Sequence, residues 1–166
     1  NGVRQNVDVF VKAPEVNEDY FETKNEVKDV KEEFLNTLKD INVCSQKGLS
    51  ERFDSTIGAG SVLMPFGGKY QITPAEGMAA KLPILKGDTT TGTVMTYGYN
   101  PKIGDWSPFH GAMYAVIESL TKLVCMGGDY RKTRLSFQEY FERLNKDSER
   151  WGKPFAALLG ALKAQE

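Results

Sequence analysis

The stretch Ser107–Gly128, SPFHGAMYAVIESLTKLVCMGG, predicts the strongest helix of the chain. Ser107 is a favourable N-cap residue, and proline is favourable at the first helical position, which Pro108 occupies. Apolar residues recur there at helical spacing and form a wide stripe: Ala112, Val116, Ile117, Leu120, Leu123 and Val124. The Gly127-Gly128 pair can adopt the left-handed conformation that ends many helices. This helix is the element around which we place the rest of the chain.

The segments outside this helix predict a mixture of strands and further helices. Alternating or β-rich residues predict strands over 7–11, 61–64 and 91–99, with 69–72 as a possible partner and 135–141 as a strand or sheet edge. Helical spacing predicts helices over 26–41, 45–53 and 154–166. The remaining segments are two expected loops, 100–105 and 142–153, and a stretch that fits no single pattern, 74–86. The predicted fold class is therefore α/β or α+β.

Composition favours an ordinary globular chain. Its 166 residues suffice for one compact domain, and the interleaved charges sum to −1, so nothing indicates a nucleic-acid partner. No apolar run approaches the roughly 20 residues of a membrane span, and no signal peptide begins the chain. The two cysteines, Cys44 and Cys125, predict neither a zinc site nor a disulfide framework. We therefore expect a cytoplasmic protein with no membrane contact.

Candidate chemistry is sparse, and each candidate has a structural alternative. The run Asp88–Gly92 offers a carboxylate, hydroxyls and amides that suit a phosphate or a metal, yet such runs also connect strands. The turn Phe66–Lys69 favours a tight hairpin over an anion site, and His110 suits packing better than catalysis. Glu118 and Lys122, four residues apart, suit either a metal ligand with a partner or an ion pair of about 0.3–0.5 kcal/mol.

Both ends of the chain lead us to expect a piece of a longer protein. The first residue is Asn1 rather than methionine. The last stretch, from Pro154 to Glu166, is helical in pattern and finishes without a glycine or proline stop signal.

Several blocks of sequence, taken in order, resemble a known family. The blocks are ERFDSTIG at 51–58, MPFGGKY at 64–70, YGYNP at 97–101, AVIESL at 115–120 with VCMGGD at 124–129, and WGKPFA at 151–156. Their order and spacing resemble the phosphoribosylformylglycinamidine synthases, the formylglycinamide ribonucleotide amidotransferases of purine synthesis, in their long single-chain bacterial form. The resemblance runs from about residue 45 to the end.

The resemblance implies a fold and a domain division. Synthases of this family contain two pseudo-symmetric copies of an aminoimidazole-ribonucleotide-synthetase-like unit. Residues 56–166 resemble most of the N-terminal α/β domain of the second copy, truncated at its C-terminus, with a mixed, mostly antiparallel sheet and helices packed on one face. Residues 26–55 would then be connecting helices, and residues 1–25 the tail of the preceding domain or a linker.

The resemblance also implies an activity for the parent enzyme. A glutamine-hydrolysing carbon–nitrogen ligase would use ATP and magnesium to convert formylglycinamide ribonucleotide to its amidine. The second copy resembles a structural site that holds ADP and magnesium. The family's main catalytic histidine and its glutaminase cysteine lie outside this chain, so we expect no catalytic residue here and an inactive fragment.

Particular residues carry the implied nucleotide and metal site. Glu118 matches a family glutamate that binds metal, and Glu76 is matched to a second acidic ligand. Lys122 stands where the family has an asparagine, and an ammonium there would repel a divalent ion or occupy its place. The implied nucleotide-binding residues are Asp88, Thr89, Thr90 and Lys122. A further acidic ligand would follow in a GGKDS-type segment that this chain lacks, so we expect no cofactor bound to the chain alone.

The sequence departs from the family at one more motif. The family's tyrosine–aspartate–histidine motif is Phe53-Asp54-Ser55 here, so no role of that histidine carries over. The implied partners are the remaining domains of the same polypeptide, including the first synthetase-like copy and the glutaminase domain. A non-catalytic scaffold that pairs through its sheet and self-associates is one alternative, and an unrelated small-molecule binder is another.

Overall fold

The computed structural model describes residues 6–14, 26–52 and 60–166, which divide into two compact units. We call Asn1–Tyr20 with Thr96–Glu166 the helical unit, and Phe21–Met95 the sheet unit. The Phe53–Ser55 motif and most of the predicted 1–25 tail lie outside the described residues. Across the described residues, no helix is long and apolar enough to cross a membrane.

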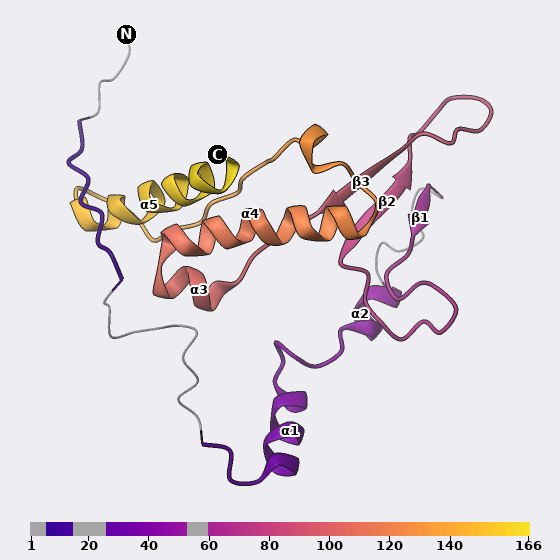
Figure 1. Ribbon diagram of the computed structural model, residues 1–166, viewed down its shortest axis with the longest axis horizontal. Helices are drawn as coiled ribbons and strands as arrows, with labels where there is room; N and C mark the ends of the chain where they lie inside the picture. Colours follow the sequence, from indigo (N-terminus) through magenta and orange to yellow (C-terminus); the bar gives the residue numbers. More distant parts are fainter. Residues whose placement is uncertain (1–5, 15–25, 53–59) are drawn as a thin grey trace. The chain divides into compact units, whose positions relative to one another are not determined.

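The helical unit is built on α4, which spans Pro108–Cys125 and confirms the strongest sequence prediction (Figure 1). The other helices of this unit are α3 (Pro101–Trp106), η1 (Tyr130–Lys132) and α5 (Ser148–Gln165). Ser107 caps α4 as predicted, and Gly127 ends it with a left-handed φ of 86°. Both α3 and α5 pack against α4, so α4 is the centre of the unit.

Small residues on α5 allow it to lie close to α4. The buried residues of α5 are Gly152, Ala156, Ala157, Gly160 and Ala161. A Cβ atom on Gly160 would overlap the carbonyl oxygen of Phe109, so only glycine permits this backbone approach. Val116 and Leu123 are the buried residues of α4. The core of the unit therefore depends on close backbone contact as well as on apolar side chains.

Helix α3 occupies most of the residues that the sequence predicts to be a loop, 100–105, so that prediction was wrong. The Asn100 carboxamide oxygen accepts hydrogen bonds from the backbone N–H groups of Lys102 and Ile103, at 3.1 and 3.2 Å. Pro101 fits the first turn, where a backbone N–H is not needed. The side chain of Ile103 is buried. The Asn100-Pro101 start signal and the burial of Ile103 thus favour a helix here, although Gly104 is unfavourable in one.

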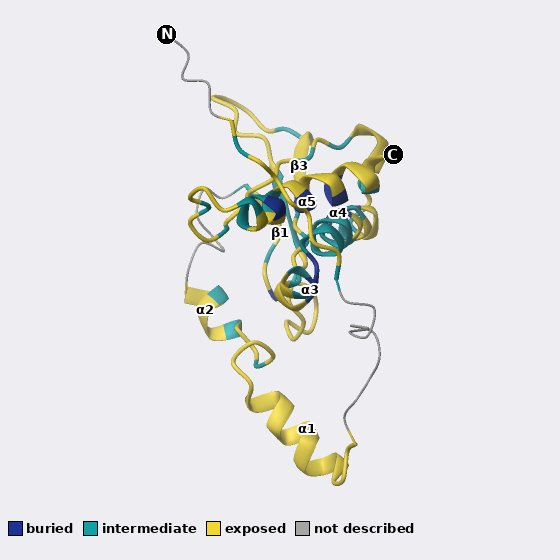
Figure 2. Ribbon diagram, turned by 90° about the vertical axis from the view of Figure 1, so that its left-hand side faces the viewer, coloured by how far each residue is buried: buried dark blue, intermediate teal, exposed yellow. Residues whose placement is uncertain are grey.

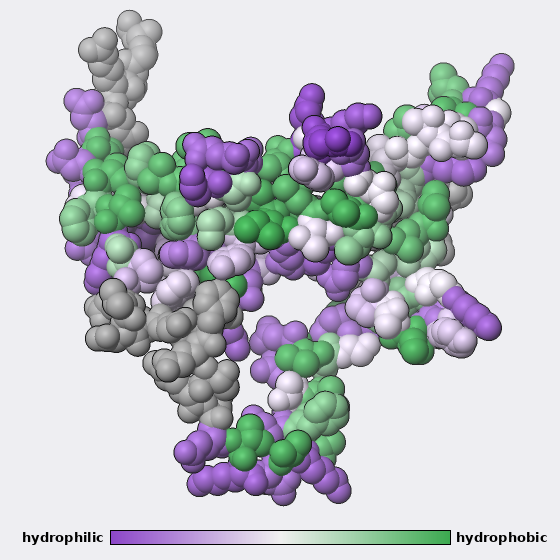
Figure 3. Space-filling view, viewed as in Figure 1, coloured by the Kyte–Doolittle hydropathy of each residue, from purple (hydrophilic) through white to green (hydrophobic). Residues whose placement is uncertain are grey.

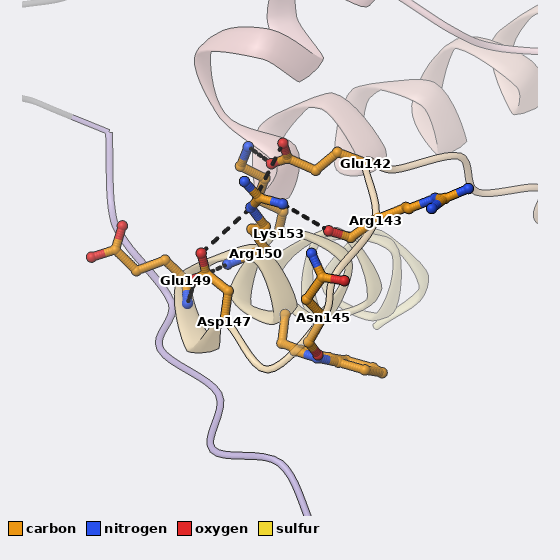
Figure 4. Close-up of polar contacts among 8 residues, drawn as sticks. Glu142, Arg143, Asn145, Asp147, Glu149, Arg150 and Lys153 are labelled. Carbon is orange, nitrogen blue, oxygen red and sulfur yellow. Dashed lines mark hydrogen bonds and ion pairs between the residues drawn. The ribbon is translucent and has the colours of Figure 1, made fainter.

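Helix α5 begins at Ser148 rather than at Pro154, which corrects the predicted loop over 142–153. The Asp147 carboxylate accepts hydrogen bonds from the backbone N–H groups of Glu149 and Arg150 and caps the helix. Figure 4 shows the Arg150 guanidinium between Asp147 and the carbonyl of Arg143, to which it donates at 3.0 Å. Pro154 lies inside the helix. The helix therefore starts at its cap, and proline is tolerated further along.

Two predicted strands of the helical unit, 7–11 and 135–141, are irregular in the structure, so both predictions were wrong. The segment 6–14 instead crosses the start of α5, where the Phe10 N–H donates to the Ser148 carbonyl at 3.0 Å. A Cβ atom on Gly152 would overlap the Phe10 carbonyl oxygen. Alternating apolar residues form a strand only beside another strand, and here the neighbour is a helix.

Within residues 26–52 and 60–95, the sheet unit contains two helices and a three-stranded antiparallel sheet of order β1-β2-β3. The elements are α1 (Val30–Lys39), α2 (Lys47–Arg52), β1 (Ser61–Leu63), β2 (Gly77–Lys81) and β3 (Gly92–Thr96), whose last residue begins the helical unit. Strand β1 pairs with β2 through Ser61 opposite Ala80 and Leu63 opposite Ala79, with an irregularity between them. The predicted α+β class is confirmed.

The partner of β1 differs from the one predicted at 69–72. That segment is a turn in which Gln71 has a left-handed φ of 52°. Strand β2 takes its place and comes from the stretch that fitted no pattern. The backbone N–H of Leu82 donates to Thr91 at 3.0 Å where β2 and β3 face each other. Because residues 65–71 form turns, the strand that pairs with β1 is the later β2.

Candidate functional site

The segment 96–99 runs along α4 and is held there by three kinds of contact. The Thr96 hydroxyl donates to the Ser119 carbonyl at 2.7 Å. The Tyr99 backbone N–H donates to Glu118 Oε2 at 3.1 Å. At Gly98, a Cβ atom would overlap the Ala115 carbonyl oxygen. Glu118 is therefore a ligand of the protein's own backbone.

Lys122 completes a charged cluster with Glu118. Its Nζ lies 2.7 Å from Glu118 Oε1, so the ion pair expected from the spacing of four is present. The same Nζ lies 4.4 Å from the centre of the Tyr97 ring, at cation–π distance. The side chain of Lys122 is 17% exposed and that of Glu118 is 39% exposed, so solvent screens the pair from the carboxylate side. We call Tyr97, Tyr99, Glu118 and Lys122 the α4 cluster.

The other predicted site residues lie in the sheet unit. Asp88, Thr89 and Thr90 form part of the connection between β2 and β3, and Glu76 directly precedes β2. The Asp88 carboxylate accepts from Lys81 Nζ at 2.8 Å, and this hydrogen bond lowers the pKa of Asp88 below its ordinary value. Glu118 thus forms an ion pair with Lys122, and Asp88 forms one with Lys81, which the sequence did not indicate.

The described residues contain no group of three or more His, Cys, Asp and Glu placed to hold a metal ion. Glu118 offers a carboxylate of the kind magnesium prefers, and Lys122 offers a positive charge to a phosphate. The loop at 88–90 offers hydroxyls and a carboxylate. The metal-binding roles of Glu76 and Glu118 and the nucleotide-binding roles of Asp88, Thr89, Thr90 and Lys122 stay predictions.

His110 takes part in the cap of α4. Its Nδ1 lies 2.8 Å from the hydroxyl of Ser107, and its ring packs on Trp106 with centroids 4.9 Å apart. Ser107 is 2% exposed. A buried serine that caps a helix is poorly placed for nucleophilic attack, so the contacts of His110 agree with the packing role predicted for it.

A depression of about 430 Å³ lies at the C-terminal end of α4. It is lined by Val124, Gly127, Gly128, Asp129, Tyr130 and Arg131. The Asp129 carboxylate accepts two hydrogen bonds from the Arg131 guanidinium, at 2.9 and 3.1 Å, and this pairing lowers the pKa of Asp129. The charges that line the depression are thus already paired with each other.

Sequence reasoning found Glu118 and Lys122 but missed the groups that contact them. Residues 97–99 belong to the predicted strand 91–99 and to the YGYNP block of the resemblance, and neither pattern indicates that Tyr97 faces Lys122. Glycine between two tyrosines was the available signal, because a glycine in an extended segment often marks a close backbone approach.

The site and the fold together define an α+β protein with a charged cluster on the central helix of its helical unit. No protein-family model matches the chain, and no solved structure matches it. The chain is similar to the phosphoribosylformylglycinamidine synthase subunit PurL of Picrophilus torridus, with 23% identity over 101 residues. The match covers 61% of this chain and 13% of that subunit. The chain thus corresponds to a small part of this relative's length.

Proposed function

We propose that this chain is an internal part of a phosphoribosylformylglycinamidine synthase of purine biosynthesis. Its residues 56–166 would belong to the N-terminal domain of the second aminoimidazole-ribonucleotide-synthetase-like unit. The observation that carries the proposal is the similarity to the PurL subunit over 101 residues. The order of the sequence blocks from 51 to 156 supports the same assignment.

The parent enzyme would be a cytoplasmic ligase that uses ATP, magnesium and glutamine. ATP would activate the amide oxygen of formylglycinamide ribonucleotide, and ammonia from a glutaminase domain would displace phosphate. This chain would supply the structural-nucleotide half rather than reacting groups. Glu76 and Glu118 would stand at the family's magnesium positions, with the Lys122 ammonium paired to Glu118. Asp88, Thr89, Thr90 and Lys122 would face nucleotide. Its partners would be the other domains of the same polypeptide.

An assay of the enzyme encoded by the whole reading frame tests this proposal. With formylglycinamide ribonucleotide, ATP and glutamine, we expect ADP release that stops when any one substrate is omitted. The 166-residue chain under the same conditions should release no ADP above buffer. Activity that does not depend on formylglycinamide ribonucleotide would refute the assignment.

A non-catalytic pairing module is a second candidate, and exposed apolar residues in the sheet unit favour it. All three residues of β1 are exposed, and so are Val94 and Met95 of β3. Unpaired strands with apolar surface promote association. Light scattering after gel filtration should then show dimers or larger species at high concentration. A strictly monomeric chain would count against this candidate.

A further inference from the structure

In the α4 cluster, the Lys122 ammonium supplies the positive charge that the Glu118 carboxylate needs. Glu118 Oε1 lies 2.7 Å from Lys122 Nζ, and Oε2 accepts the Tyr99 N–H. A partly buried carboxylate is costly unless it is paired and hydrogen-bonded. Both kinds of contact are provided here by the chain itself.

The position of Lys122 conflicts with a metal ion on the same carboxylate oxygen. Magnesium binds carboxylate oxygens at about 2.0–2.1 Å, so an ion on Oε1 would lie within about 5 Å of the ammonium. Two positive charges this close repel each other, and the 17% exposure of the Lys122 side chain limits how far solvent screens that repulsion. The Tyr97 ring lies 4.4 Å from Nζ, and its negative face favours keeping the ammonium in place.

We infer that Lys122 is a built-in cation that neutralises Glu118, holds segment 96–99 on α4 without a metal, and excludes divalent ions from this carboxylate. The role of Lys122 in nucleotide binding rests on the proposed function, because that function supplies the nucleotide. In the parent enzyme, a nucleotide at this site would meet the Lys122 ammonium instead of a magnesium ion bound to Glu118. Lys122 is thus a specificity-determining residue of the site.

The contacts of segment 96–99 show how the Lys122 ammonium helps to hold this segment on α4. Tyr97 and Tyr99 flank Gly98, whose backbone touches the Ala115 carbonyl. One tyrosine contributes its ring to Lys122, and the other contributes its N–H to Glu118. Loss of the ammonium would leave the carboxylate without this neutralising charge and would weaken both contacts at once.

Paramagnetic broadening by manganese tests the inference in isotope-labelled protein. In the wild type, we expect millimolar Mn²⁺ to leave the amide signals of residues 97–99 and 118–122 no more broadened than exposed amides elsewhere. In Lys122→Met, which removes the charge and retains an apolar stem, Mn²⁺ should broaden these signals selectively. The double variant Lys122→Met with Glu118→Gln should lose that selective broadening.

Two results would overturn the inference. One is selective broadening at the α4 cluster in the wild type, which needs no variant to fold. The other is a folded Lys122→Met protein that gains no broadening there. Either result leaves the ADP-release assay of the parent enzyme untouched, so failure of this inference is distinguishable from failure of the proposed function.

Discussion

The helical unit and the sheet unit differ in how they bury their apolar residues. Seven apolar side chains of the described residues are buried, and Phe66 is the one that belongs to the sheet unit. Helix α1 has no buried residue, although its apolar positions recur at helical spacing. Figure 2 shows α1 exposed along its length, and Figure 3 shows apolar side chains at the surface of both units.

An amphipathic pattern alone therefore does not make a core. Helix α1 has a good cap, since Asp29 accepts from the N–H groups of Lys31 and Glu32. Helix α4 has a comparable cap at Ser107 and also has α3 and α5 packed against it. An isolated helix of ten residues is marginal in water, so tertiary packing decides which helix is stable. We expect stability to reside mainly in the helical unit.

Matched leucine truncations in the two units should differ most in their effect on stability. Leu123→Ala removes a side chain that is 7% exposed, whereas Leu35→Ala removes one that is 45% exposed. We expect Leu123→Ala to lower the free energy of unfolding by about 3 kcal/mol, because it leaves a cavity beside α4. Leu35→Ala should change it by less than about 0.5 kcal/mol. Urea denaturation followed by circular dichroism measures both, and equal losses would refute the assigned cores.

Glycine-to-alanine substitutions test the close contact between α4 and α5. Gly160→Ala would force a Cβ atom onto the Phe109 carbonyl oxygen, and we expect a loss of about 2 kcal/mol. Gly48→Ala in α2 is the matched control, since no atom lies within 4 Å of its Cβ position. Alanine favours helix there, so the control should be neutral or stabilising by up to about 1 kcal/mol. Thermal melting distinguishes the two, and a harmless Gly160→Ala would contradict the packing.

Removal of the N-caps of α4 and α1 should affect global stability in one case and local stability in the other. Ser107→Ala should cost about 1 kcal/mol of global stability, because α4 unfolds only with the rest of its unit. Asp29→Ala should instead speed hydrogen exchange within α1 and leave the global midpoint nearly unchanged. Exchange measured by mass spectrometry, beside urea midpoints, checks both outcomes. A global loss from Asp29→Ala as large as that from Ser107→Ala would show that α1 is part of the main core.

Glu142, which lies before α5 and pairs with Lys153 on that helix, should give a weaker effect that depends on pH. Its hydrogen bond from Lys153 lowers the pKa of Glu142 below the ordinary value of 4.5, with added attraction from the charge of Lys153. A lowered folded-state pKa means that the stabilisation is present above 4.5 and is lost as pH falls through the folded-state value. Glu142→Gln should therefore reduce the acid-side decline in melting temperature. An unchanged decline would show that the pair contributes nothing.

Local signals in the sequence were enough to predict α4, α2, β1 and β3. They failed where the neighbour of a segment decided its structure. Residues 7–11 have a strand pattern but meet the backbone of α5 at Gly152, and residues 100–105 contain a glycine yet form α3 around buried Ile103. Spacing along one helix revealed the Glu118–Lys122 pair. The contact with Tyr97 depends on the path of the chain and could not be predicted.

Growth of a purine-requiring bacterial strain tests whether this chain is part of a phosphoribosylformylglycinamidine synthase. The strain would lack its own phosphoribosylformylglycinamidine synthase and would carry either the complete reading frame that contains this chain or the 166-residue chain alone. We predict that the complete frame restores growth without added purine and that the chain alone does not. Failure of the well-expressed complete frame to restore growth, or restoration by the chain alone, would contradict the account.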